Sequence, residues 1–248
     1  MDINLKDVEQ IVRTVLASMQ TQTQAAPAAA RRVAPGVFAE LDDAVAEASL
    51  AQKGIRTLAV RTRVIEAIRK VCEEHARELA ELAVAETGMG RVEDKIAKNI
   101  SQARHTPGVE CLSPMVLTGD RGLTLIENAA WGVIASVTPS TNPAATVINN
   151  AISMIAAGNA VVFAPHPAAK KVSQRAVSLI NEASVAAGGP DNIVTTVLEP
   201  DIATAQRLFS YPGINLLTVT GGEAVVEAAR KHTDKRLIAA GAGNPPVV

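Results

Sequence analysis

From residue 132 onwards the chain alternates short apolar runs rich in Val, Ile and Ala with longer runs of helical periodicity. This alternation limits the fold more than any other feature, because it is typical of βαβ units with parallel strands. The predicted strands are residues 132–137, 160–163, 193–197, 214–219 and 236–240. The predicted helices between them are residues 144–157, 168–187, 202–209 and 223–231. The pattern therefore predicts an α/β fold, a doubly wound parallel sheet with flanking helices.

The composition agrees with such a sheet and excludes several classes of partner. Aromatic residues make up 2% of the 248 residues and hydrophobic residues 48%, so the core must be aliphatic, which suits helices packed on parallel strands. The net charge of −1 gives no overall field that would attract nucleic acid. No apolar run is long enough to cross a membrane, and no secretory signal is present. We expect a cytoplasmic protein that binds neither nucleic acid nor membranes.

The first 36 residues differ in character from the rest of the chain. Residues 1–20 place apolar side chains at spacings of three and four, which predicts a short amphipathic helix. Residues 21–36 are rich in Gln, Thr, Ala and Pro and are interpreted as a flexible linker. A helix this short is marginal alone in water, so its apolar stripe is expected to dock on a partner or to fold back on its own domain. Residues 37–248 then form one domain.

The segment between the linker and the sheet is predicted to be mainly helical. Residues 41–85 fit two or three helices, and residues 91–103 fit another after the glycines Gly88 and Gly90. Residues 115–127 contain two apolar runs around a glycine turn, which predicts a hairpin.

Parallel sheets bind ligands at the carboxyl ends of their strands, which directs attention to the loops there. Asn142 and Pro143 follow the first strand, where they suit the N-cap and first position of a helix, although an amide at that place can also donate to an oxyanion. His166 lies between two prolines after the second strand. Gly221 and Gly222 precede a helix and could let backbone amides approach a phosphate.

The chain offers no obvious nucleophile or metal site. No Gly-x-Gly-x-x-Gly follows a strand, and no paired carboxylates, Ser/His/Asp set or metal cluster stands out. Cys72 and Cys111 lack metal or disulfide spacing, and we expect both to be buried small hydrophobic residues.

Several of these motifs carry a family resemblance, and the likeness runs along the whole chain. The stretches concerned are Trp131–Pro143, Glu86–Gly90, Ala164–Pro167, Val219–Gly222 and Gly241–Pro246. Together they resemble the N-terminal half of the coenzyme A-acylating aldehyde dehydrogenases of bacterial microcompartments, and most of all those of ethanolamine utilization. The resemblance implies an aldehyde dehydrogenase-like Rossmann-type sheet.

The resemblance also implies a reaction, in which acetaldehyde, CoA and NAD⁺ give acetyl-CoA and NADH through a thioester on a catalytic cysteine. Asn142 would hold the oxyanion. The NAD and CoA groove would be lined by Thr138, Pro139, Ser140, Pro165, His166, Gly188, Thr220, Gly221, Gly222, Val225, Ala240 and Gly241. Hydrolytic relatives carry a glutamate in the loop of the last strand, where this chain has Ala239–Gly241. That difference favours transfer to a thiol over hydrolysis.

The resemblance further assigns residues 1–20 as a packaging helix that binds microcompartment shell proteins, which places the protein in the microcompartment lumen. It also implies a homo-oligomer at full length. The family's catalytic cysteine belongs to a second domain absent from this chain, so we expect the chain alone to be inactive. Propionaldehyde as substrate, a non-catalytic binding or packaging module, and a truncated inactive fragment are the alternatives.

Overall fold

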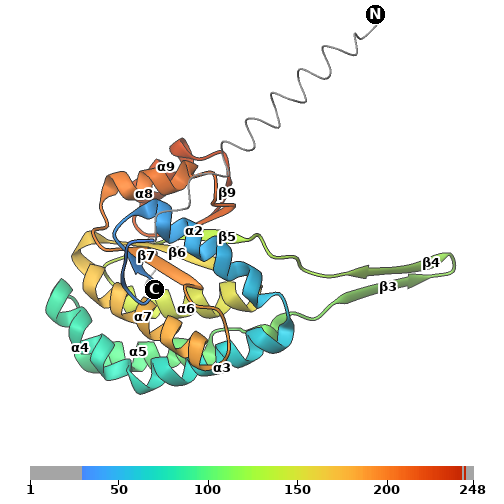
Figure 1. The fold of residues 1–248 in the computed structure, drawn as a ribbon, viewed down its shortest axis with the longest axis horizontal. Helices are drawn as coiled ribbons and strands as arrows, with labels where there is room; N and C mark the ends of the chain where they lie inside the picture. The colour runs from blue at the N-terminus through green and yellow to red at the C-terminus, as the bar shows by residue number, and fades with distance from the viewer. Residues whose placement is uncertain (1–29, 242, 244–248) are drawn as a thin grey trace, which may run out of the picture. The chain divides into compact units, whose positions relative to one another are not determined.

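The computed structural model describes residues 30–241 and 243, and a seven-stranded sheet forms their centre (Figure 1). The strand order is β1-β2-β7-β6-β5-β8-β9. All the pairings are parallel except that of β1 with β2. The strands are β1 (Arg32–Ala34), β2 (Val37–Phe38), β5 (Val133–Thr138), β6 (Ala160–Pro165), β7 (Val194–Val197), β8 (Leu216–Thr220) and β9 (Arg236–Ala240).

The five predicted parallel strands and the four helices between them are confirmed to within three residues at each end. The connecting helices are α6 (Pro143–Ala156), α7 (Lys170–Ala186), α8 (Ile202–Ser210) and α9 (Glu223–His232). The chain moves outward from β5 through β6 to β7, and then returns to the other side of β5 to form β8 and β9. The sheet is therefore doubly wound, and its order reverses between β5 and β8.

Helices cover both faces of the sheet (Figure 1). Helices α6 and α7 pack on one face, and the other carries α8 and α2 (Leu41–Gln52). Right-handed crossovers require this arrangement, because the direction of winding changes after β7. A further layer packs against α6 and α7, made of α3 (Leu58–Glu74), α4 (Ala76–Thr87) and α5 (Val92–His105). Helices α2 to α5 confirm the helices predicted in residues 41–85 and 91–103.

The core lies between the sheet and these helices and is aliphatic, as the composition predicts. Ile148, Ile152 and Ile155 of α6 are fully buried, as are Val161 of β6 and Ile180 of α7. Each such side chain contributes about 1.5–3 kcal/mol through burial. The loops at the carboxyl edge of the sheet are thus held by a rigid base.

Strands β1 and β2 were not predicted, and β1 falls within the predicted linker 21–36. The compact unit that contains the sheet begins at Arg31, so the domain begins before residue 37. The two short strands depend on pairing with β7, in which the Thr196 amide donates to the Gly36 carbonyl at 2.8 Å. Strands of two or three residues are too short to show a periodic pattern in the sequence. The strand β7, with which β2 pairs, is also distant in the chain. The packaging helix predicted for residues 1–20 lies outside the described residues.

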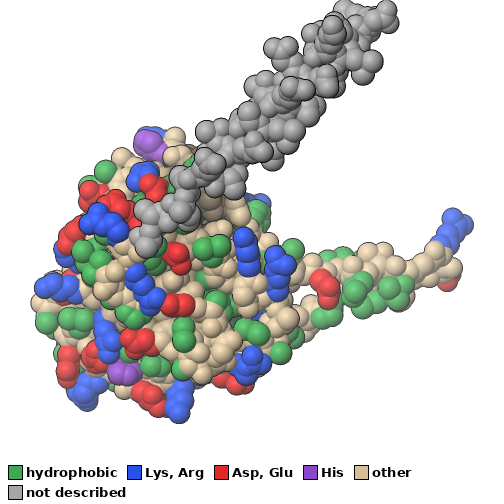
Figure 2. Space-filling view, in the orientation of Figure 1, with side chains coloured by type: hydrophobic (Ala, Val, Ile, Leu, Met, Phe, Trp, Pro, Cys, Tyr) green, Lys and Arg blue, Asp and Glu red, His purple; other side chains and the backbone are tan. Residues whose placement is uncertain are grey.

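The predicted hairpin is confirmed as β3 (Met115–Gly119) and β4 (Gly122–Ile126), a two-stranded ribbon that projects from the domain (Figure 1). Within the described part of the chain, these strands pair only with each other. Their large apolar side chains are exposed, and hydrophobic atoms run along the ribbon in Figure 2.

The two cysteines differ in their surroundings. Cys72 of α3 is buried, and burial raises the pKa of its thiol to about 12. Cys111 is exposed, so the expectation that both are buried is wrong for this residue. It ends the short helix η2 (Val109–Cys111), just before the projecting hairpin. Among the helices of the described segment, none is both long and apolar enough to span a membrane.

Candidate functional site

A groove of about 940 Å³ opens at the carboxyl ends of β5, β6, β8 and β9. Helices α8 and α9 form its walls. It includes the point between β5 and β8 where the strand order reverses, which is where doubly wound sheets bind their ligands. A groove of this size accommodates a large cofactor.

Eleven of the twelve predicted cofactor residues line this one groove. They are Thr138, Pro139, Ser140, Pro165, His166, Thr220, Gly221, Gly222, Val225, Ala240 and Gly241. Gly188 is not among the residues that line it. That glycine follows α7 and precedes β7, with φ of +75°, so it ends a helix near the amino end of the sheet. Its assignment to the groove is therefore wrong, and its left-handed backbone is what a helix end requires.

Thr138, the last residue of β5, presents an unpaired polar atom at the groove. The residue is 1% exposed, and its Oγ1 has no hydrogen-bond partner among the described residues. Its backbone carbonyl accepts from the His166 amide at 3.1 Å, which joins the loops after β5 and β6. A buried hydroxyl without a partner is uncommon, and a bound ligand would satisfy it.

His166 is held in place by its own loop. Its Nδ1 accepts from the Ala168 amide at 3.1 Å, which caps the short helix η3 (Pro167–Ala169). In a neutral imidazole with Nδ1 as acceptor, the proton is on Nε2. The exposed ring therefore offers a donor at the edge of the groove.

The glycines after β8 and β9 leave the backbone accessible. At Gly222 and Gly241, a Cβ atom would meet nothing within 4 Å. Gly222 is also the N-cap of α9, and the amino end of a helix favours negative charge. This corner of the groove suits a phosphate.

Apart from Val225 of α9, the predicted groove residues do not include the apolar helical walls. The missed residues that line the groove include Ile202, Ala205, Gln206 and Phe209 of α8, and Ala224 and Ala228 of α9. Ile202 is 73% exposed, so its side chain is accessible to a ligand in the groove. The spacing of these residues along each helix was a usable signal, but the same spacing is typical of core positions.

Asp201 is the only carboxylate among the described residues that line the groove. Its Oδ1 accepts from the Thr204 amide at 2.7 Å and caps α8. This backbone hydrogen bond lowers the pKa of Asp201 below its ordinary value. The carboxylate of Asp201 therefore has a structural role as the N-cap of α8.

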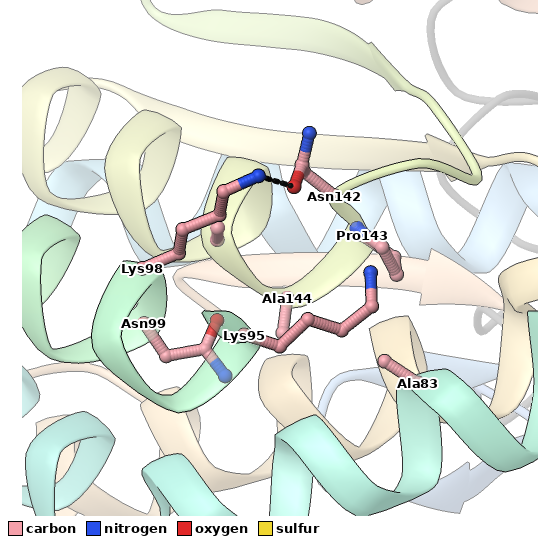
Figure 3. Close-up of a pocket in the computed structure, with 8 residues that line it drawn as sticks. Ala83, Lys95, Lys98, Asn99, Asn142, Pro143 and Ala144 are labelled. Atoms are coloured by element: carbon pink, nitrogen blue, oxygen red, sulfur yellow. Dashed lines mark hydrogen bonds between the residues drawn. The ribbon is translucent and has the colours of Figure 1, made fainter. Parts of the chain in front are cut away.

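Asn142 lies beside the groove, in a small crevice between α6, α5 and α4 (Figure 3). Asn142 and Pro143 occupy the N-cap and the first turn of α6, as predicted. The Asn142 side chain makes no capping bond, however. Its Oδ1 instead accepts from Lys98 Nζ at 3.1 Å. No described residue accepts from its Nδ2, so this amide group is available to another acceptor.

Both cysteines of the described residues lie away from these two cavities. Neither Cys72 nor Cys111 lines the groove or the crevice. Within residues 30–241, no group of three His, Cys, Asp or Glu side chains could hold a metal ion.

Comparison with known proteins agrees with this architecture. The model of the aldehyde dehydrogenase family matches residues 15–248. The acetylating acetaldehyde dehydrogenase EutE of Salmonella typhimurium is 72% identical over 246 residues, which cover 99% of this chain and 52% of that protein. The chain thus spans about half the length of the curated relatives it matches.

Two solved structures are also similar. A propionaldehyde dehydrogenase from the fucose utilisation microcompartment of Clostridium phytofermentans has 48% identity and a TM-score of 0.83, over 86% of this chain and 49% of that one. The propionaldehyde dehydrogenase of Rhodopseudomonas palustris, with bound CoA and an acylated cysteine, has 43% identity and a TM-score of 0.82, over 85% and 49%. With the family match over nearly its whole length, the chain belongs to the aldehyde dehydrogenase family.

Proposed function

We propose that this chain supplies the cofactor groove and the oxyanion donor of an acylating acetaldehyde dehydrogenase, which converts acetaldehyde, CoA and NAD⁺ to acetyl-CoA and NADH in ethanolamine breakdown. The observation that carries the proposal is the groove at the reversal of strand order, with Asn142 beside it. The 72% identity to an acetylating acetaldehyde dehydrogenase supports this substrate over propionaldehyde.

The groove fits the part that NAD⁺ and CoA share, an adenosine with a pyrophosphate. The apolar walls formed by Ile202 and Val225 suit a planar base. The Thr138 hydroxyl and the His166 ring offer hydrogen bonds, and the amino end of α9 suits the pyrophosphate. One groove would thus serve both ligands in turn. NAD⁺, when bound, supplies the hydride acceptor.

Asn142 would act on the aldehyde oxygen. Its Nδ2 donates a hydrogen bond to that oxygen as negative charge develops during attack by a thiol. Such a donor contributes about 10²–10³-fold to kcat.

Transfer to CoA rather than to water is supported by the loop after β9. Ala239 and Ala240 end β9 and Gly241 begins this loop, and none of the three carries a carboxylate. Asp201, the one carboxylate on the described groove lining, caps a helix. No base to activate water is therefore provided from these positions, which leaves the thioester for a thiol.

Calorimetry with NAD⁺ and CoA tests the proposal. We expect both ligands to bind the chain and to compete. Gly222→Val should weaken the binding of both ligands by at least about tenfold, because the valine side chain enters the open space where the phosphate is expected to bind. Gly119→Val is the matched control, since it also meets nothing within 4 Å but lies on the hairpin. Equal binding by both variants would refute the groove assignment.

A non-catalytic binding module is the second candidate, and the position of the two cysteines favours it. The measurement that separates the two is CoA-dependent NADH formation from acetaldehyde. We expect binding without turnover from the chain alone, and rapid turnover would show that one of its own groups serves as the nucleophile.

We also propose that residues 1–20 bind microcompartment shell proteins and bring the protein into the lumen. The amphipathic pattern of the sequence supports this, as does the microcompartment source of a similar structure. A fluorescent reporter fused to residues 1–20 should form foci in cells that make microcompartments, and diffuse fluorescence would exclude the role.

A further inference from the structure

Two lysines of α5 face the loop that ends at Asn142. Lys95 and Lys98 are three residues apart and so lie on one face of the helix. Lys95 Nζ donates to the Thr141 carbonyl at 2.8 Å, and Lys98 Nζ donates to Asn142 Oδ1 at 3.1 Å. Lys95 thus holds the backbone before Asn142. Lys98 holds the side chain of Asn142, and Figure 3 shows this contact.

The contact with Lys98 determines which way the amide of Asn142 is turned. An ammonium group has three donors and no acceptor, so only the oxygen of the amide can face it. The Nδ2 group must then point away from Lys98, as it does in Figure 3. The positive charge at Oδ1 also polarises the amide, which makes Nδ2 a stronger donor.

The positions of these two lysines are expected to destabilise the fold rather than to stabilise it. Lys95 is 7% exposed, and burial, followed by the nearby charge of Lys98, lowers its pKa. Both ammonium groups contact the amino end of α6, where the helix dipole disfavours positive charge. The side chain of Asn142 is also drawn away from the capping bond that its position offers.

We propose that Lys98 and Lys95 are positioning residues that fix Asn142 with its Nδ2 turned outward as the oxyanion donor. This proposal rests on the proposed function of Asn142. Lys98 sets the rotation of the amide, and Lys95 fixes the loop on which it stands.

The first test observes the amide directly and needs no turnover. In the chain labelled with ¹⁵N-asparagine, the Nδ2 signal is assigned by its loss in Asn142→Ala. We expect Lys98→Met to shift this signal and Lys98→Arg to restore it in part, because arginine is also only a donor. The control is Lys70→Met, since Lys70 is an exposed lysine whose ion-pair partner is Glu74. An unchanged Nδ2 signal in Lys98→Met would overturn the proposal.

The second test is a double-mutant cycle in the intact enzyme that contains this chain. Lys98→Met should lower kcat about tenfold, a part of the loss expected for removing the donor, with the KM for CoA nearly unchanged. In the Asn142→Ala background, Lys98→Met should cause no further loss. The same loss in both backgrounds would show that Lys98 does not act through Asn142. Full activity of Asn142→Ala would instead refute the oxyanion role, which separates failure of the proposed function from failure of this inference.

Discussion

Two glycines with left-handed backbones show how a single residue limits substitution. Gly88 has φ of +67° and ends α4, and a Cβ atom there would meet nothing within 4 Å. Gly36 has φ of +70°, but its Cβ atom would lie 2.1 Å from Asn181 Nδ2 and 2.6 Å from the Val194 carbonyl oxygen. Asn181 is itself buried and donates to that carbonyl at 2.7 Å, so it has little room to move.

We predict that Gly88→Ala lowers the free energy of unfolding by about 1 kcal/mol, the cost of a left-handed alanine. Gly36→Ala should cost at least about 3 kcal/mol, because the methyl group also displaces the packed contact between β2, β7 and α7. Urea titration followed by circular dichroism gives both values. If both variants lost the same free energy of unfolding, the backbone at Gly36 would have to shift freely to accommodate the methyl group.

At the scale of elements, helix α7 is capped by a residue distant in sequence. Glu86, near the end of α4, accepts from the backbone amides of Lys171 and Val172 at 2.8 and 2.9 Å. These amides belong to the first turn of α7, where no helical carbonyl is available to them. The carboxylate also complements the positive end of the helix dipole. This explains the glutamate that begins the Glu86–Gly90 motif.

We expect Glu86→Ala to lower the free energy of unfolding by about 1–2 kcal/mol, because it leaves two amides unsatisfied. Glu81→Ala is the matched control on the same helix, since Glu81 makes only an exposed ion pair with Arg77. Glu81→Ala should lower the free energy of unfolding by less than about 0.5 kcal/mol. Thermal unfolding of both variants measures the difference, and similar losses would contradict the capping role.

The elements that the sequence predicts well are those with a long periodic signal. Helix α6 was predicted as residues 144–157 and is Pro143–Ala156, because its apolar period runs through the whole helix. The groove loops were predicted from strand ends and from the family resemblance. Except for Val225, the residues of α8 and α9 that form the walls were missed, since apolar helical positions have the same spacing whether they face a core or a ligand. The contact between Lys98 and Asn142, 44 residues apart, left no local pattern.

For the whole molecule, the projecting hairpin is the surface that most needs a partner. Val116 and Leu125 pair across the two strands and are 51% and 55% exposed. Met115 and Ile126 pair likewise, 58% and 47% exposed. Exposed apolar side chains on a ribbon with free edges favour association with another chain. We propose that this ribbon lies in the interface of a homo-oligomer.

We predict that Val116→Thr with Leu125→Thr reduces self-association in sedimentation velocity experiments, because both side chains lose apolar surface that would be buried between chains. The urea midpoint should stay nearly unchanged, since β3 and β4 pair only with each other within the described residues. Leu50→Thr on α2 serves as control, as Leu50 is also 58% exposed. Unaltered association in the double variant would place the interface elsewhere.

The sequence by itself determined the α/β class, the order of strands and helices from residue 132 onwards, and the loops that line the groove, because periodicity and strand ends are local properties. Only the tertiary structure decided that β1 and β2 join the sheet, that Gly188 lies away from the groove, and that Lys98 contacts the side chain of Asn142. These depend on contacts between residues far apart in the chain. Such contacts form only when the parallel sheet has brought their elements together, so no local pattern records them.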